Sequence, residues 1–182
     1  MGARRIALLR GVNVGGNKMV AMADLRALLT RLGFGDVQSL LQSGNLVFSV
    51  RGAARSCAAL ESHLEQEVEK ALGLKADFHV RTADEWQAVI KGNPFRAEAA
   101  SDPGHLLVSF FREPLVKANV AALRAAITGP ETLHADGRHL YMVFPDGMGN
   151  SKAASLIGKK LAARGTARNW NTVQKLSALA GR

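Results

Sequence analysis

The stretch that decides the fold is LLRGVNVGGNK, residues 8–18. A short apolar run, Ile6 to Leu9, ends at Arg10 and passes into a glycine-rich loop. Beyond the loop, apolar residues recur with helical spacing over residues 22–32. Glycine adopts backbone conformations that other residues resist, so N–H groups in such a loop can converge on an anion. The stretch therefore predicts a strand, a loop that can face a ligand, and a helix.

The loop lacks two nucleotide-binding signatures. Gly11 and Gly16 have P-loop spacing, but Asn17-Lys18-Met19 follows where that motif requires Gly-Lys-Ser/Thr. The dinucleotide pattern G-x-G-x-x-G is also missing. Two interpretations remain: a tight structural connection, or a loop for an anionic or polar ligand without nucleoside-triphosphatase chemistry.

The periodicity of the remaining chain predicts the same order of elements twice, strand-helix-strand-strand-helix-strand. In the first half we expect strands at 4–10, 37–42, 45–50 and 75–81 and helices at 22–32 and 56–72. In the second half we expect strands at 105–112, 131–135, 138–144 and 165–169 and helices at 116–127, 151–163 and 172–180. Turn dipeptides, Ser43-Gly44 and Asp136-Gly137, separate the paired strands of each half.

This order is that of the ferredoxin-like motif. The predicted fold class is α+β, with two tandem ferredoxin-like (α-β plait) subdomains, each with an antiparallel sheet, plus a connecting helix and a C-terminal helix. We expect the first subdomain over residues 1–81, a helical connection over 82–104 and the second subdomain over 105–182.

The predicted topology places two distant segments together. Right-handed crossovers put the first and third strands in the middle of the sheet. The end of the first strand and the turn between the second and third then emerge at one edge, so residues 10–18 and 42–45 become neighbours. We expect a polar ligand surface there, with further contacts from the C-terminal third. The predicted ligand-binding residues are Arg10, Asn13, Gly15, Gly16, Asn17, Lys18, Gln42, Ser43, Asn45, Lys152, Arg168, Asn169 and Asn171.

The segment 168–172, RNWNT, also has a structural interpretation. Asn171 would cap the last helix, and Trp170 would pack that helix against the core. Contact of Arg168 and Asn169 with a ligand is the alternative.

Basic residues cluster at both ends of the chain, whose formal net charge is +9. Residues 1–20 hold four Lys or Arg, residues 151–182 hold seven, and neither segment holds an acid. Such clustering favours an anionic partner, a small molecule or a nucleic acid, and a soluble protein with basic ends is the alternative. Nucleic-acid (RNA or DNA) binding would use the basic ends and the second sheet, whose Phe110, Phe111 and Tyr141 could stack on bases.

The sequence offers no evident catalytic constellation. Its five histidines lack metal-ligand spacing, and neither Ser43 nor Ser151 has an adjacent general base. We expect no metal and no cofactor, and we keep an enzyme acting on a phosphorylated or nucleotide-like substrate as a third alternative. The single cysteine, Cys57, is interpreted as a buried, inert thiol, although its place near a helix N-terminus could lower its pKa. We also expect a cytoplasmic location and no membrane span, because no apolar run approaches roughly 20 residues.

Three segments carry a resemblance to a known family. They are residues 7–16 (ALLRGVNVGG), 42–48 (QSGNLVF) and 168–173 (RNWNTV). With these three segments in this order along the sequence, the chain resembles the uncharacterised, mostly bacterial domain-of-unknown-function family 1697. Leu40-Leu41 departs from that family, which often has an aromatic residue and an isoleucine there, and the departure bears on core packing. The resemblance implies tandem α-β plait subdomains and supplies no established activity, cofactor or catalytic residue.

Overall fold

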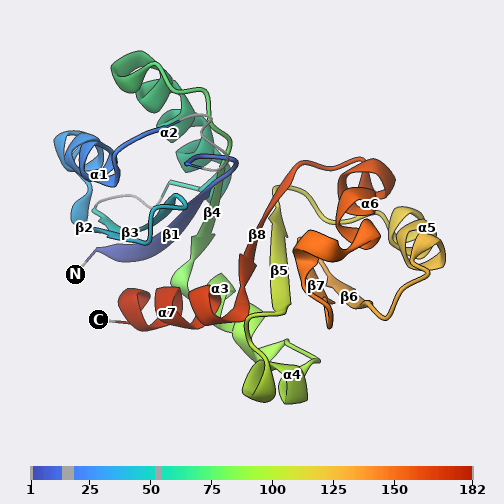
Figure 1. Cartoon of the computed structure of the whole chain (residues 1–182). Coiled ribbons are helices and arrows are strands. Elements are labelled where there is room, and N and C mark those ends of the chain that lie inside the picture. The colour runs from blue at the N-terminus through green and yellow to red at the C-terminus, as the bar shows by residue number, and fades with distance from the viewer. Residues whose placement is uncertain (1, 14–18, 52–54, 182) are drawn as a thin grey trace. The chain divides into compact units, whose positions relative to one another are not determined.

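The computed structural model describes residues 2–13, 19–51 and 55–181 and divides the chain into two compact units. The first unit comprises residues 1–88 and 175–182, and the second comprises residues 89–174. Figure 1 shows a mixed α+β arrangement, with a four-stranded antiparallel sheet in each unit.

The first unit has the predicted element order. Its elements are β1 (Ala3–Leu9), α1 (Met22–Arg31), β2 (Gly35–Leu40), β3 (Asn45–Val50), α2 (Cys57–Leu72), β4 (Phe78–Thr82), the greater part of α3 (Ala83–Lys91) and the end of α7 (Trp170–Ala180). The strands lie in the order β2-β3-β1-β4. β1 is central and antiparallel to both neighbours, with Leu8 opposite Asn45 on β3 and His79 on β4. This is the sheet order of the ferredoxin-like motif.

Alternation along the strands of the first unit sends one set of side chains toward the helices. Ala7 and Leu9 of β1 belong to the same core cluster as Phe48 of β3. Leu25 of α1 and Leu64 of α2 complete that cluster from the helical layer, and Figure 1 shows both helices on one face of the sheet. Apolar side chains that recur every second residue in the strands therefore pack against apolar side chains that recur about every 3.6 residues in the helices.

The second unit repeats this architecture. Its elements are α4 (Arg96–Ser101), β5 (Leu106–Phe111), α5 (Lys117–Ala126), β6 (Thr132–Asp136), β7 (His139–Val143), the 3-10 helix η1 (Met148–Asn150), α6 (Lys152–Leu161), β8 (Gly165–Asn169) and the start of α7 (Trp170–Ala180). The strand order is β6-β7-β5-β8. Leu123 of α5 and Leu161 of α6 pack with Leu140 and Met142 of β7.

Several predicted boundaries were wrong. β2 ends at Leu40, which pairs with Asn45, so the turn comprises residues 41–44 and Leu41 adopts a left-handed φ of 58°. β4 begins at Phe78 because its partner β1 ends at Leu9, directly opposite. α4 was not predicted as a helix: none of its residues is buried, so it leaves no apolar period in the sequence.

The last helix also begins earlier than predicted, and its cap is a different residue. α7 starts at Trp170. The Asn169 Oδ1 atom accepts hydrogen bonds from Thr172 N at 3.0 Å and from Thr172 Oγ1 at 2.9 Å. Asn169, not Asn171, is therefore the N-cap residue, because its side chain satisfies an N–H group that the first helical turn leaves without an intrahelical partner.

The division into units differs from the subdomain boundaries expected from sequence. The segment 82–104, expected to be a connection, is divided after Ala88, and the boundary near the C-terminus falls within α7, after Gln174. The first unit therefore includes residues from both ends of the chain.

Candidate functional site

The predicted neighbours meet at one edge of the first sheet. Leu9 N donates to Gly44 O at 2.8 Å, which joins the end of β1 to the β2–β3 turn. Asn13 Nδ2 donates to Gln42 O at 2.7 Å, four residues further along the loop. For the described residues of these two segments, the expected juxtaposition is confirmed. We call this surface, residues 9–13 and 41–44, the loop edge.

Gly44 allows this close approach. It is buried, with a φ of +73°, a region that favours glycine. A Cβ atom at this position would lie 2.6 Å from Val12 Cγ2 and 2.7 Å from Leu9 Cβ. The absence of a side chain at residue 44 is therefore what lets the turn pack directly on the end of β1.

Asn13 fastens the loop with its side chain. Its Nδ2 donates to Val20 O at 2.9 Å as well as to Gln42 O, and its Oδ1 accepts from Val20 N at 2.8 Å. Both amide hydrogens are thus used, since an asparagine amide carries two. Asn13, predicted as a ligand residue, acts here as a clip that holds the base of the loop against the turn.

Asn45 is likewise structural. It is fully buried, and its Nδ2 donates to Leu40 O at 2.9 Å and to Ser43 Oγ at 3.0 Å. The side chain closes the hairpin from within and faces no solvent. Ser43 is half-buried and Gln42 is exposed, so these two turn residues remain at the surface of the loop edge.

Arg10 stands at the same edge. Its main-chain N–H donates to the main-chain carbonyl of Asp77 at 2.9 Å, and its side-chain Nη1 lies 3.7 Å from Asp77 Oδ2. The Arg10 side chain is 42% exposed, which makes this pair a solvent-screened one, worth at most about 1 kcal/mol. Arg10 therefore presents positive charge at the loop edge beside a nearby carboxylate.

The other predicted ligand residues fall into two groups. Gly15, Gly16, Asn17 and Lys18 lie outside the described residues. Lys152, Arg168, Asn169 and Asn171 belong to the second unit. Lys152 and Asn171 are exposed, whereas Asn169 is occupied as the cap of α7.

Arg168 is buried and forms hydrogen bonds to residues of its own strand, β8. Its Nη1 donates to Thr166 Oγ1 and to Ala167 O, both at 2.7 Å. Burial lowers the pKa of its guanidinium to about 10, so the group stays charged at neutral pH. These contacts support the structural interpretation of the segment 168–172.

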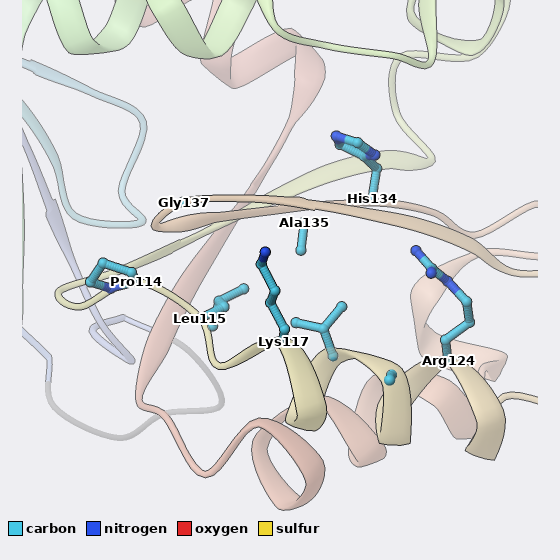
Figure 2. Close-up of a pocket in the computed structure, with 9 residues that line it drawn as sticks. Pro114, Leu115, Lys117, Arg124, His134, Ala135 and Gly137 are labelled. Atoms are coloured by element: carbon cyan, nitrogen blue, oxygen red, sulfur yellow. The ribbon is translucent and has the colours of Figure 1, made fainter.

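A cleft in the second unit was not predicted. It lies between α5 and the β6–β7 hairpin, has a volume of about 480 Å³, and is shown in Figure 2. We call it the α5–β6 cleft; its lining residues are Pro114, Leu115, Lys117, Val120, Ala121, Arg124, His134, Ala135 and Gly137. The sequence carried one signal for it, the basic residues Lys117 and Arg124 seven positions apart on one predicted helix.

The aromatic rings expected to stack on bases are buried. Phe110 and Tyr141 have no exposed surface, and Phe111 has 2%. The Tyr141 hydroxyl donates to Val89 O at 2.7 Å. A platform for bases requires exposed ring faces, so these residues do not supply one.

Neither a metal site nor a reactive thiol emerges from the described parts of the chain. Within them, no group of three or more His, Cys, Asp or Glu residues could hold a metal ion. Cys57 Sγ lies 3.6 Å from Glu85 Oε2, and burial, followed by the charge of Glu85, raises the pKa of the thiol. A raised pKa means less thiolate at neutral pH, in agreement with an inert cysteine, but Cys57 is half-buried and not buried as predicted.

Comparison with known proteins gives the family. The family described as "Protein of unknown function (DUF1697)" matches residues 3–141. The chain belongs to the DUF1697 family. No curated protein matches it. A solved structure of a conserved bacterial protein from Streptococcus pneumoniae is similar, with a TM-score of 0.76, 24% identity and 99% coverage of both chains. That likeness shows the fold.

The DUF1697 match takes in both surfaces described above. The loop edge and the α5–β6 cleft lie within residues 3–141, whereas Lys152 and the segment 168–172 lie beyond them. Across the described residues of this DUF1697 protein, no helix is both long enough and apolar enough to cross a membrane.

Proposed function

We propose that this protein binds a small anionic or polar ligand at the loop edge of its first unit. The observation that carries the proposal is the bond from Asn13 Nδ2 to Gln42 O, which holds the loop after β1 and the β2–β3 turn together beside Arg10. Arg10, Gln42 and Ser43 are the described residues that would contact the ligand; Asn13 and Asn45 would hold them in position.

The chemistry of Arg10 favours an anion. A guanidinium has five N–H donors in a planar fork and pairs well with carboxylate or phosphate oxygens. The pair with Asp77 is half-exposed and screened by solvent, and pairs of this kind contribute little to stability. The exposed Gln42 side chain adds both a donor and an acceptor for the polar part of the ligand.

Calorimetric titration with inorganic phosphate, pyrophosphate and adenosine monophosphate tests this proposal. We expect at least one of them to bind, and Arg10→Ala to weaken that binding about tenfold or more through loss of a charge-assisted hydrogen bond. Arg31→Ala is the matched control, since Arg31 is an exposed arginine in the last turn of α1 of the same unit.

Two results would contradict the proposal. One is the absence of binding by all three anions. The other is binding that Arg10→Ala and Arg31→Ala weaken equally, which would indicate general attraction to positive charge. A parallel titration with single-stranded RNA covers the nucleic-acid alternative: tight binding with a steep salt dependence, and weak binding of the small anions, would favour that alternative instead.

A further inference from the structure

The α5–β6 cleft combines the size of a ligand pocket with a single sign of charge. Its volume of about 480 Å³ lies within the roughly 300–1,000 Å³ typical of small-molecule sites. Among its lining residues, three are basic and none is acidic. Figure 2 shows the His134 side chain on the opposite side of the strand from Ala135 and Lys117. The positive charge inside the cleft therefore comes from Lys117 and Arg124.

These two cations lie at the two ends of the stretch of α5 that lines the cleft. They are seven residues apart on α5, which is two helical turns, so they share one face and are separated by roughly 10 Å along the axis. In Figure 2 both side chains rise from α5 toward β6, Lys117 near the beginning of the helix and Arg124 near its end. A ligand lying along the helix would meet one cation at each end.

The surface between the cations is apolar. Val120 and Ala121 of α5 lie between them in sequence, with Leu115 before the helix and Ala135 on β6. Val120 is 9% exposed and belongs to the core of the unit, so the floor of the cleft is continuous with that core. Apolar lining with a few well-placed polar groups is the usual character of a binding pocket.

One structural role also accounts for part of this charge. β6 is the edge strand of its sheet, and Arg124 Nη2 donates to Leu133 O at 3.4 Å. Proteins place charged side chains along sheet edges to prevent edge-to-edge pairing with another chain. That role explains Arg124 but explains neither Lys117 at the other end nor the ligand-sized volume between them.

We propose that the α5–β6 cleft binds an elongated organic dianion, with one anionic group at Lys117, one at Arg124 and an apolar chain over Val120 and Ala121. The ligand class is an α,ω-dicarboxylate or a molecule of the same pattern. This site consists of residues of the second unit and shares none with the loop edge, so the proposal stands whether or not the loop edge binds a ligand.

Amide NMR titration of the full chain with sebacate, octanoate and succinate tests the proposal. Sebacate has two carboxylates and a long alkyl chain, octanoate has one carboxylate, and succinate is too short to reach both cations. We expect sebacate to bind at least about tenfold more tightly than either, because each of the others loses one charge-assisted contact. The amide signals of Leu133, Ala135 and Gly137 should shift.

Paired substitutions locate the site. Lys117→Ala and Arg124→Ala should each weaken sebacate binding about tenfold and remove the preference over octanoate, whereas Lys160→Ala, an exposed lysine of α6 outside the cleft, should not. Ala121→Leu should block the alkyl chain. Ala122→Leu adds the same volume at an exposed neighbour that does not line the cleft, and it should leave binding unchanged.

Three outcomes would overturn the proposal. One is equal binding of sebacate and octanoate; a second is shifts confined to residues outside the cleft. The third is the absence of binding together with self-association of the Arg124→Ala variant, which would assign the cations to protection of the sheet edge.

Discussion

The two units join the end of their first strand to the following hairpin in the same way, and then diverge. In the first unit Leu9 N donates to Gly44 O at 2.8 Å; in the second, Phe111 N donates to Arg138 O at 3.0 Å. Beyond that shared bond, the first unit has a long connection to α1 held by the Asn13 side chain, whereas the second has a short one held by the main chain, from Leu115 N to Gly137 O at 2.9 Å.

The divergence continues where the helix faces the edge strand. In the first unit Arg26 of α1 donates to the Ser39 hydroxyl of β2, so the side chains meet across the two elements. In the second unit the equivalent space between α5 and β6 is the α5–β6 cleft, where Arg124 reaches Leu133 O at 3.4 Å. One topology therefore supports two different candidate surfaces, the loop edge and the α5–β6 cleft. The two differ because the length of one connection and the identity of a few side chains differ between the units.

The sharpest test of this comparison replaces the glycine of each hairpin turn with alanine. Gly44→Ala should lower the free energy of unfolding of the first unit by about 3 kcal/mol, through a positive φ of +73° and a Cβ within 2.7 Å of Leu9 and Val12. Gly137→Ala should cost the second unit about 1 kcal/mol, because its φ is +53° but nothing lies within 4 Å of the added Cβ.

Each unit contains one tryptophan, Trp86 in the first and Trp170 in the second, so fluorescence can follow the units separately. Urea unfolding of the Trp170→Phe background reports the first unit, and unfolding of Trp86→Phe reports the second. If Gly44→Ala and Gly137→Ala lowered the free energy of unfolding equally, close packing around Gly44 would not be the difference between the two turns.

Removal of the clip should have the next largest effect. Asn13→Ala deletes three hydrogen bonds and places alanine at a φ of 54°, so we expect the first unit to lose about 2–3 kcal/mol. Urea unfolding followed by Trp86 fluorescence measures this loss. Gln42→Ala is the control, because the main-chain carbonyl of Gln42, not its side chain, accepts the bond; a similar loss in that variant would show that the clip is not the cause.

The smallest effect concerns the asparagines near the end of the second unit. Asn169→Ala should cost about 1 kcal/mol through loss of the N-cap of α7, and Asn171→Ala should change stability by no more than about 0.5 kcal/mol. Trp170 fluorescence during urea unfolding reports both changes. The reverse order would restore Asn171 as the capping residue.

Much of the fold could be predicted because its signals are local. The alternation of Ala7 and Leu9, the helical spacing of Leu60, Leu64 and Val68, and the glycines after helices each act within a few residues. α4 could not be predicted, since a short exposed helix has no buried face to leave an apolar period. The cap of α7 was misplaced by two positions because two asparagines lie close together and the sequence alone does not show which has the extended backbone of a cap.

The meeting of the two segments at the loop edge could be predicted from the sequence, but the hydrogen bonds of their side chains could not. Topology requires the end of β1 and the β2–β3 turn to meet, and they do. Asn13 and Asn45 looked like ligand residues because exposed polar side chains in loops often are. In the structure their amides satisfy backbone groups instead, a use that depends on which carbonyls the folded chain brings within reach.

The sequence by itself determined the two α-β plait units, the order of their strands and the meeting of loop and turn, because hydrophobic periodicity and the handedness of crossovers are properties of the chain. Tertiary structure alone decided that Asn13 would be a clip, that Arg168 would be buried, and that Lys117 and Arg124 would face one cleft. The reason is physical: burial and hydrogen-bond partners depend on distances between segments far apart in the chain, and those distances exist only once the chain has folded.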